Sequence, residues 1–254
     1  MSSEQRVNTE DSDRCKALFT TLSRDITPLK ARQAATVLHF PMSQAGELGR
    51  YCPSLLSKAE RARADRFACA GDRMVYILSR AFRRYCGVTA LDSRVPFSKI
   101  VFEETPKGQP YLSGAPGLGF SFSSCRLGIL GAWSKTRSIG VDIEDNSKTL
   151  EAAVLARHYF TTSEAEAVVS ACSDERRLLF YRLWCLKEAA LKSIGEGLPY
   201  GLHQFAFELD PGVCVTRSPA TYGEPECFDA HLIEGSSLCA ALVARDPAGA
   251  RDRP

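Results

Sequence analysis

The sequence predicts an α+β fold, and the order of its helix and strand patterns is the main reason. After a first strand at 35–40, two helical segments precede a run of short strands in the first half of the chain. In the second half, three helical segments precede four strands. Helices that come before the strands, instead of alternating with them, favour α+β over a parallel doubly wound sheet.

The N-terminal half is expected to start with a polar extension. Residues 1–30 are polar with one short helical pattern at 14–24, so we expect a loosely attached segment. Ser57 is a suitable N-cap for a basic helix, and Gly87 is expected to end the amphipathic helix that follows. The elements predicted for this half are the strand at 35–40, helices at 57–67 and 72–86, and strands at 98–103, 118–123 and 129–134.

The C-terminal half repeats this style. We expect the division near Thr136, with an N-terminal half at 31–136, a C-terminal half at 137–246 and a polar tail at 247–254. The predicted elements are helices at 150–158, 163–171 and 174–194, and strands at 205–209, 213–217, 227–233 and 238–245.

Composition excludes several classes of protein. The chain of 254 residues has 32 basic and 30 acidic side chains, so its net charge of +2 gives no field that would draw it to nucleic acid or a membrane surface. No apolar stretch approaches the ~18 residues of a membrane span, and the polar start lacks the core of a signal peptide. A cytoplasmic location is the expectation. The ten cysteines show no C-x-x-C spacing, so reduced buried thiols are expected.

An acidic strand is the first candidate for a functional site. Val141 and Ile143 alternate with Asp142 and Glu144, which is the pattern of a half-buried strand with both carboxylates on one face. Magnesium binds one or two protein carboxylates and takes its other ligands from water and phosphate. A charged strand end that faces solvent is the alternative interpretation.

The helix predicted at 174–194 carries the second candidate. It contains no glycine or proline, and Gly195 is well placed to end it in a left-handed conformation. Trp184, Glu188 and Lys192 follow one another at intervals of four and therefore line one stripe. The same helix could present a metal-binding carboxylate and a phosphate-binding lysine, although an ordinary solvated Glu/Lys pair has the same spacing.

The two segments together resemble the surfactin-type 4′-phosphopantetheinyl transferase family. Its motifs are (Ile/Val)-Gly-(Ile/Val)-Asp-(Ile/Val)-Glu and (Phe/Trp)-x-x-Lys-Glu-(Ala/Ser)-x-x-Lys, which match 139–144 and 184–192. Weaker matches at 61–124 and 160–164 extend the resemblance over roughly residues 57–246. It implies a pseudo-dimer of two similar α/β halves, with the active site in the cleft between them.

The resemblance also implies a reaction. Such enzymes transfer the 4′-phosphopantetheine arm of coenzyme A to a serine of an acyl or peptidyl carrier protein and release 3′,5′-ADP. Asp142, Glu144 and Glu188 would bind Mg2+, with Mn2+ as an alternative metal. Lys192 and Lys187 would stabilise phosphate charge. A monomer with an internal cleft is expected from the length of the chain.

Glu164 matches a family glutamate that is proposed to assist deprotonation of the serine. Its position directly after Ser163 also fits the start of a helix, where the macrodipole favours acids. The role of this residue therefore has two interpretations, one catalytic and one structural.

The contacts to coenzyme A are where this chain departs from the family pattern. Ser124 stands where a histidine is usual, Gln109 where a lysine is usual and Val75 where an arginine is expected. These changes predict weaker binding of coenzyme A. Nearby basic groups such as Arg126 could compensate, or could form a solvated basic face. The candidates for donor binding are Arg63, Arg66, Arg73, Lys107, Gln109, Ser123, Ser124 and Lys192.

Two other functions stay open at the level of sequence. A degenerate homologue could bind a carrier protein or a nucleotide without catalysis, because the donor contacts depart from the pattern. A magnesium-dependent phosphohydrolase could use the same acidic strand, and it would release phosphate without a carrier protein.

Overall fold

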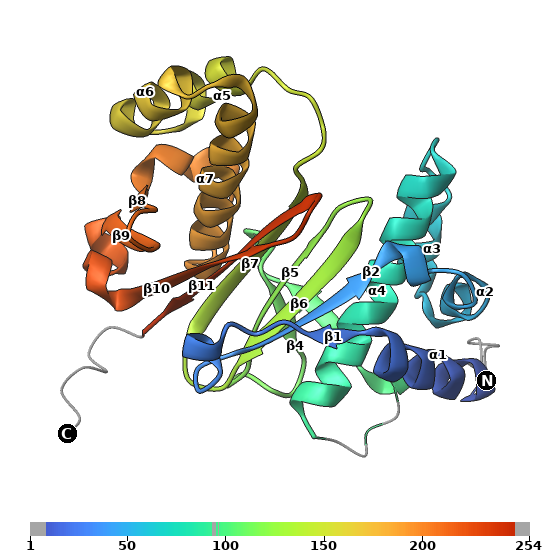
Figure 1. The fold of residues 1–254 in the computed structure, drawn as a ribbon. Coiled ribbons are helices and arrows are strands. Elements are labelled where there is room, and N and C mark those ends of the chain that lie inside the picture. The colour runs from blue at the N-terminus through green and yellow to red at the C-terminus, as the bar shows by residue number, and fades with distance from the viewer. Residues whose placement is uncertain (1–8, 93–94, 96, 247–254) are drawn as a thin grey trace.

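Two antiparallel sheets pack face to face between two long helices, α4 and α7 (Figure 1). The structure, a computed structural model, describes residues 9–92, 95 and 97–246. The expected tail at 247–254 and the first eight residues of the expected extension lie outside the described residues. Helices and antiparallel sheets occur together in one chain, so the α+β prediction is confirmed.

The N-terminal half has a four-stranded sheet in the order β1-β2-β6-β5 and a separate hairpin of β3 and β4. Its helices are α1 (Thr9–Leu22), α2 (Leu48–Tyr51), α3 (Lys58–Ala64) and α4 (Ala70–Ala90). Its strands are β1 (Arg24–Asp25), β2 (Thr36–Pro41), β3 (Phe102–Glu104), β4 (Pro110–Leu112), β5 (Gly119–Ser124) and β6 (Gly128–Ser134).

The C-terminal half has a three-stranded sheet in the order β10-β11-β7 and a second hairpin of β8 and β9. Its helices are α5 (Ala152–Tyr159), α6 (Thr162–Ser170) and α7 (Ser173–Ser193). Its strands are β7 (Ser138–Asp145), β8 (Ala206–Glu208), β9 (Cys214–Arg217), β10 (Phe228–Glu234) and β11 (Leu238–Arg245). Residue 136, the expected division, lies in the turn between β6 and β7.

Three apolar clusters hold these layers together. One packs α1 and α4 on the outer face of the first sheet, and another packs α7 on the outer face of the second. The third lies between the sheets and includes Val37 and Leu130 from one sheet, and Val141 and Leu242 from the other. Burial of such side chains is the main source of folding stability. Side-chain hydrogen bonds also join the sheets, since Ser121 Oγ of β5 accepts from the Val141 amide of β7 at 3.0 Å.

The expectation of a loosely attached N-terminal extension is wrong for its described part. Helix α1 packs into the first core through Cys15 and Phe19, which have no exposed surface. The Phe19 ring lies edge-on to Phe40, with 5.2 Å between centroids. Residues 9–22 therefore belong structurally to the N-terminal half.

Two predicted boundaries in this half also differ. Gly87 does not end α4, which continues to Ala90. A Cβ at Gly87 would approach Ile100 Cγ2 to 2.7 Å, so this glycine permits close packing inside the helix. The strand expected at 98–103 starts only at Phe102, because residues 97–99 form a 3-10 turn that buries Phe97 and Ile100 at its threefold spacing.

Candidate active site

Asp142 lies at the centre of the candidate site, on β7 of the second sheet. It is 4% exposed. Its Oδ1 atom accepts hydrogen bonds from Lys192 Nζ at 2.7 Å and from Ser123 Oγ at 2.8 Å. Its Oδ2 atom is buried and has no hydrogen-bond partner among the described residues. A buried carboxylate oxygen without a donor is costly, so this atom is available for a ligand that carries positive charge.

Close packing of α7 on β7 brings Lys192 to Asp142. Gly140 faces the helix, and a Cβ at this position would overlap the carbonyl oxygen of Ala189. Only glycine allows this approach of two backbones. Lys192 Nζ also donates to the carbonyl oxygen of Val141 at 3.2 Å, so one lysine is fixed against two consecutive residues of the strand.

The C-terminal end of α7 has the geometry expected from the sequence. Gly195 has φ of +72°, and the amides of Gly195 and Glu196 donate to the carbonyls of Lys192 and Leu191. These bonds form a Schellman cap, which needs a residue in the left-handed region. The cap ends the helix one turn after Glu188 and turns the chain towards Gln109, whose side chain packs on Gly195.

The electrostatics of this region show an excess of carboxylate. Burial and, next in size, the nearby charge of Asp142 raise the pKa of Glu144 to about 7. Burial also raises the pKa of Glu188, with Asp142 adding to the effect. Burial lowers the pKa of Lys192, but the Asp142 carboxylate outweighs it and holds that pKa above the usual value. One lysine therefore does not fully neutralise these acids.

A divalent cation fits this region through the free Oδ2 atom of Asp142 and the raised pKa of Glu144. Two carboxylates are enough for magnesium, which takes other ligands from water and phosphate. No group of three histidine, cysteine, aspartate or glutamate side chains in the described part of the chain is already arranged to hold a metal. That Asp142, Glu144 and Glu188 together bind one metal ion therefore stays a proposal.

Two adjoining cavities lie where the halves meet. The first, of about 210 Å³, is lined by residues 107–110 and by residues 120–122 of β5 from the N-terminal half, and by Glu188 and Lys192 from α7. The second, of about 400 Å³, is lined by α4, by Ser124 and Arg126, and by Glu144 of β7. Arg83 of α4 lines both. A ligand that spans them would contact both halves of the chain.

The residues expected to bind the donor divide between these cavities and the surface. Lys107, Gln109 and Lys192 line the first cavity. Arg63 and Ser124 line the second, where Val75 occupies the position that lacks an arginine. Ser123 is engaged with Asp142.

Besides Ser123, two more of the expected donor contacts line neither cavity. Arg73 is exposed and forms an ion pair with Asp65 at 2.6 Å. Arg66 is exposed on the turn after α3 and lines neither cavity. The structure therefore brings together only part of the expected donor-binding set.

Lys187 and Glu164 do not belong to this cleft as it is folded. Lys187 Nζ lies 2.7 Å from Glu164 Oε2, and their side chains are 0% and 6% exposed. The ammonium also donates to the carbonyl oxygens of Leu202 and Phe205. Both residues are absent from the linings of the two cavities. The structure thus gives both residues structural contacts, and the roles in phosphate binding and in deprotonation that the resemblance implies stay predictions.

The contacts of Glu164 agree with its structural interpretation. It forms a capping box with Thr161 at the start of α6, and its Oε1 atom accepts from the Phe207 amide at 3.1 Å. Both carboxylate oxygens thus accept hydrogen bonds from groups of the chain itself.

Sequence reasoning missed Arg80 and Arg83. Both lie on α4 and line cavities at the junction of the halves. A signal was present in the helical spacing of Tyr76, Arg80, Arg83 and Arg84, which places the four side chains on one stripe.

The fold and the site define a class of protein in which carboxylates and basic side chains meet at a cleft between two α/β halves. Residues 138–243, from β7 to β11, match the family model of the 4′-phosphopantetheinyl transferase superfamily. The chain belongs to this superfamily. The family predicted from the two motifs is confirmed.

Three relatives illustrate the similarity. The L-aminoadipate-semialdehyde dehydrogenase-phosphopantetheinyl transferase of Xenopus laevis is 30% identical over 187 residues, which is 66% of this chain and 61% of that protein. The 4′-phosphopantetheinyl transferase psf-1 of Bacillus pumilus is 28% identical over 65% of this chain and 69% of its own. The 4′-phosphopantetheinyl transferase HetI of Nostoc sp. is 31% identical over 62% of this chain and 65% of its own. The match thus covers less than two thirds of the Xenopus and Nostoc proteins.

Two expectations from composition can be compared with the structure. All ten cysteines are free, and six of them are buried. Among the described helices, none has the length and apolar character to span a membrane.

Proposed function

We propose that this protein transfers the 4′-phosphopantetheine arm of coenzyme A to a serine of an acyl or peptidyl carrier protein and releases 3′,5′-ADP. The observation that carries the proposal is the arrangement at Asp142, with one oxygen bound to Lys192, which lines a cavity where the halves meet, and the other without a partner among the described residues. The names of the relatives support the same reaction.

The reaction is the attack of a serine oxygen on the β-phosphorus of a pyrophosphate, with departure of the adenosine bisphosphate. Asp142 and Glu144, with Glu188 from α7, would hold Mg2+ or Mn2+, which supplies charge neutralisation at the pyrophosphate oxygens. Lys192, held by Asp142 at 2.7 Å, is positioned to stabilise negative charge on the leaving phosphate. Because this lysine is fixed before the donor binds, little reorganisation is needed during the reaction.

The two halves would form the pseudo-dimer that the family resemblance implies. Each half has an antiparallel sheet and one outer helix of 21 residues, α4 in the first half and α7 in the second. Both halves contribute to the cleft, so one chain provides a complete site. We therefore propose that a monomer is active.

The experiment is incubation of the protein with coenzyme A, MgCl2 and an unmodified carrier protein, followed by intact mass measurement of the carrier. The expected result is the mass of one phosphopantetheine arm on the carrier, lost when a chelator removes the metal. Release of phosphate without any carrier would instead identify a phosphohydrolase. Binding of donor or carrier without a mass change would identify a non-catalytic homologue.

A further inference from the structure

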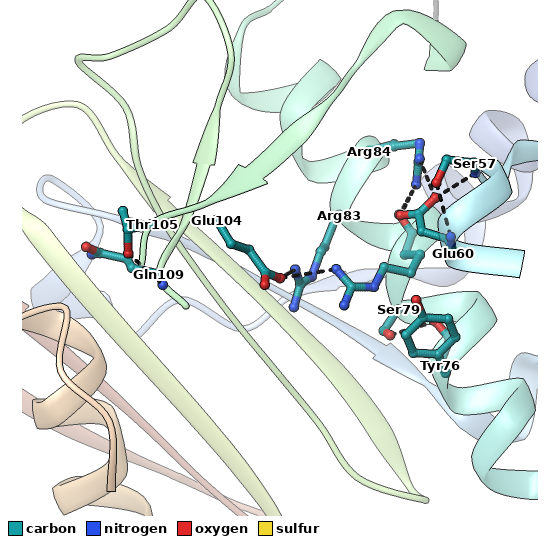
Figure 2. Close-up of polar contacts among 10 residues, drawn as sticks. Ser57, Glu60, Tyr76, Ser79, Arg83, Arg84, Glu104, Thr105 and Gln109 are labelled. Atoms are coloured by element: carbon teal, nitrogen blue, oxygen red, sulfur yellow. Dashed lines mark hydrogen bonds and ion pairs between the residues drawn. The ribbon is translucent and has the colours of Figure 1, made fainter. Parts of the chain in front are cut away.

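Four arginines surround a cavity of about 400 Å³ between α3, α4 and the β3 strand. Arg63 comes from α3, whereas Arg80, Arg83 and Arg84 come from α4. Figure 2 shows Glu104 of β3 directed at Arg83 of α4. It also shows Glu60 of α3 directed at Arg84, the next residue of α4. The cavity lies next to the donor cleft, because Arg83 lines this cavity and both cavities of the candidate site.

The charges around this cavity do not balance. Arg84 and Glu60 form a closed pair at 2.8 Å, with side chains 12% and 19% exposed. Glu104 alone faces two arginines, Arg80 at 3.4 Å and Arg83 at 3.1 Å. Four arginines and two glutamates therefore leave two positive charges in excess within the described residues.

Aromatic rings hold the arginines in place. The guanidinium groups of Arg63 and Arg80 lie over the Tyr76 ring, at 5.6 Å and 5.1 Å from its centroid. Arg83 lies over the Phe122 ring at 5.1 Å. Stacking fixes the plane of a guanidinium without using its N–H donors, so these donors stay available to an anion.

Arg83 keeps an unsatisfied donor although it shares Glu104 with Arg80. Its side chain is only 19% exposed, and its Nε atom is buried without a hydrogen-bond partner among the described residues. Burial lowers the pKa of Arg83 to about 10, and repulsion by Arg80 acts in the same direction. An anion bound between Arg80 and Arg83 would relieve both effects.

We propose that Arg80 and Arg83 form a binding site for a phosphomonoester dianion, with Glu104 as the carboxylate that this phosphate displaces. Two guanidinium forks match the tetrahedral oxygens of a phosphate dianion, whereas a single carboxylate can neutralise only one of them. The ligand that we assign to this site is the phosphate on the ribose of the coenzyme A nucleotide, and this assignment rests on the proposed function.

This site explains how the chain tolerates its departures from the family pattern. Val75, Gln109 and Ser124 line the cleft without positive charge, although charged residues are usual at their positions. Arg80 lies one turn after Tyr76 and Arg83 one turn after Ser79, so both reach the region that these three residues leave uncharged. Arg80 and Arg83 would supply the missing charge from other positions of α4.

Calorimetric titration with 3′,5′-ADP, 5′-AMP and inorganic phosphate tests this proposal. The native protein is expected to bind 3′,5′-ADP more tightly than 5′-AMP. Arg80→Gln and Arg83→Gln should each weaken 3′,5′-ADP binding about tenfold or more and remove most of the preference over 5′-AMP. Unchanged affinity in both variants would overturn the site.

Two further variants protect the test against misfolding. Glu104→Gln removes the competing carboxylate and should tighten 3′,5′-ADP binding, which a merely structural ion pair would not do. Arg137→Gln is the matched control, because this arginine is 23% exposed and paired with Asp229 and Asp246 at the far end of β7. It should leave nucleotide affinity unchanged, and an equal loss in this variant would contradict the proposal.

The remaining outcomes separate the site from the proposed function. Inorganic phosphate that binds as tightly as 3′,5′-ADP, in an Arg83-dependent manner, would overturn the nucleotide assignment and identify free phosphate as the ligand. Arginine-dependent nucleotide binding without any transfer to a carrier would support the site and contradict the transferase. Transfer to a carrier with an unchanged KM for coenzyme A in Arg83→Gln would support the transferase and contradict the site.

Discussion

Lys187 and Lys192 lie on the same helix but on surfaces that the protein uses in opposite ways. Lys187 has no exposed side-chain surface and is bound by Glu164 and two backbone carbonyls. Lys192 is 29% exposed and shares Asp142 with a serine, while the second oxygen of that aspartate has no partner among the described residues.

The comparison shows how saturation of hydrogen bonds separates structure from function. Around Glu164, both oxygens have donors, and the pair joins α6 and α7 to β8. Around Asp142, acids outnumber bases and one oxygen is free. In a saturated buried ion pair, each carboxylate oxygen already has a donor from the protein. In an unsaturated pair, a carboxylate oxygen without a donor can still bind a ligand.

The largest effect on stability is expected from Lys187→Met. This change leaves Glu164 buried without a counter-charge and should lower the free energy of unfolding by about 3 to 5 kcal/mol. Urea denaturation followed by circular dichroism measures it. Lys192→Met is the comparison variant and should cost less, because Lys192 is 29% exposed and Asp142 keeps its hydrogen bond from Ser123. Equal losses in the two variants would erase the difference between the two surfaces.

The next largest effect is expected in the rate of transfer. Glu188→Gln removes a carboxylate that lines the cleft beside Lys192, and the rate should fall by about 10² or more. Initial rates from intact mass of the carrier protein give the value. The matched control is Asp229→Asn, which should not change the rate. Asp229 is a paired aspartate on β10, in the sheet on which α7 packs. Undiminished transfer by Glu188→Gln would remove Glu188 from the site.

A third prediction concerns the saturated pair of Glu60 and Arg84 and its dependence on pH. Burial alone would raise the pKa of Glu60, but Arg84 outweighs it and holds that pKa below the usual value. A depressed pKa stabilises the folded state above the unfolded-state pKa of about 4.3, and this stabilisation is lost as the pH falls towards the folded-state pKa.

The free energy of unfolding of the native protein should therefore exceed that of Glu60→Gln by about 1 to 2 kcal/mol at neutral pH. The difference should shrink only in acid, below about pH 4. Thermal unfolding of both proteins across this range measures the effect. A difference that stays constant into acid would show that the carboxylate charge is not what stabilises this junction.

The smallest effect is expected at Lys107. Its ion pair with Glu196 joins the two halves beside the cleft, but the lysine side chain is 61% exposed. Lys107→Gln should therefore change the free energy of unfolding by less than about 1 kcal/mol. Because Lys107 lines the first cavity, the KM for coenzyme A should rise. A stability loss as large as that of Lys187→Met would refute the distinction between exposed and buried pairs.

Local patterns predicted the elements of the site well. The alternation around Asp142 predicted β7, and the absence of glycine and proline predicted α7 up to its cap at Gly195. These features depend on residues close together in the sequence, so the sequence alone carries them.

Long-range contacts could not be predicted in the same way. The partner of Lys187 depends on how α6 and residues 202–207 pack on α7, which no local pattern reveals. The helical spacing of Arg80 and Arg83 was visible, but a solvated face has the same spacing, and only the position of β3 distinguishes the two. The core packing of α1 depends on Cys15 and Phe19, four residues apart, with Leu18 and Leu22 packed beside them.

The most direct test of the contrast between the two surfaces is the rate of arm transfer per folded molecule for Asp142→Asn and Lys187→Met. We predict that Asp142→Asn loses a factor of about 10² or more while it stays folded. Lys187→Met should lose stability but keep the native rate in the fraction that remains folded. A native rate in Asp142→Asn together with an inactive folded fraction of Lys187→Met would contradict the assignment of the site.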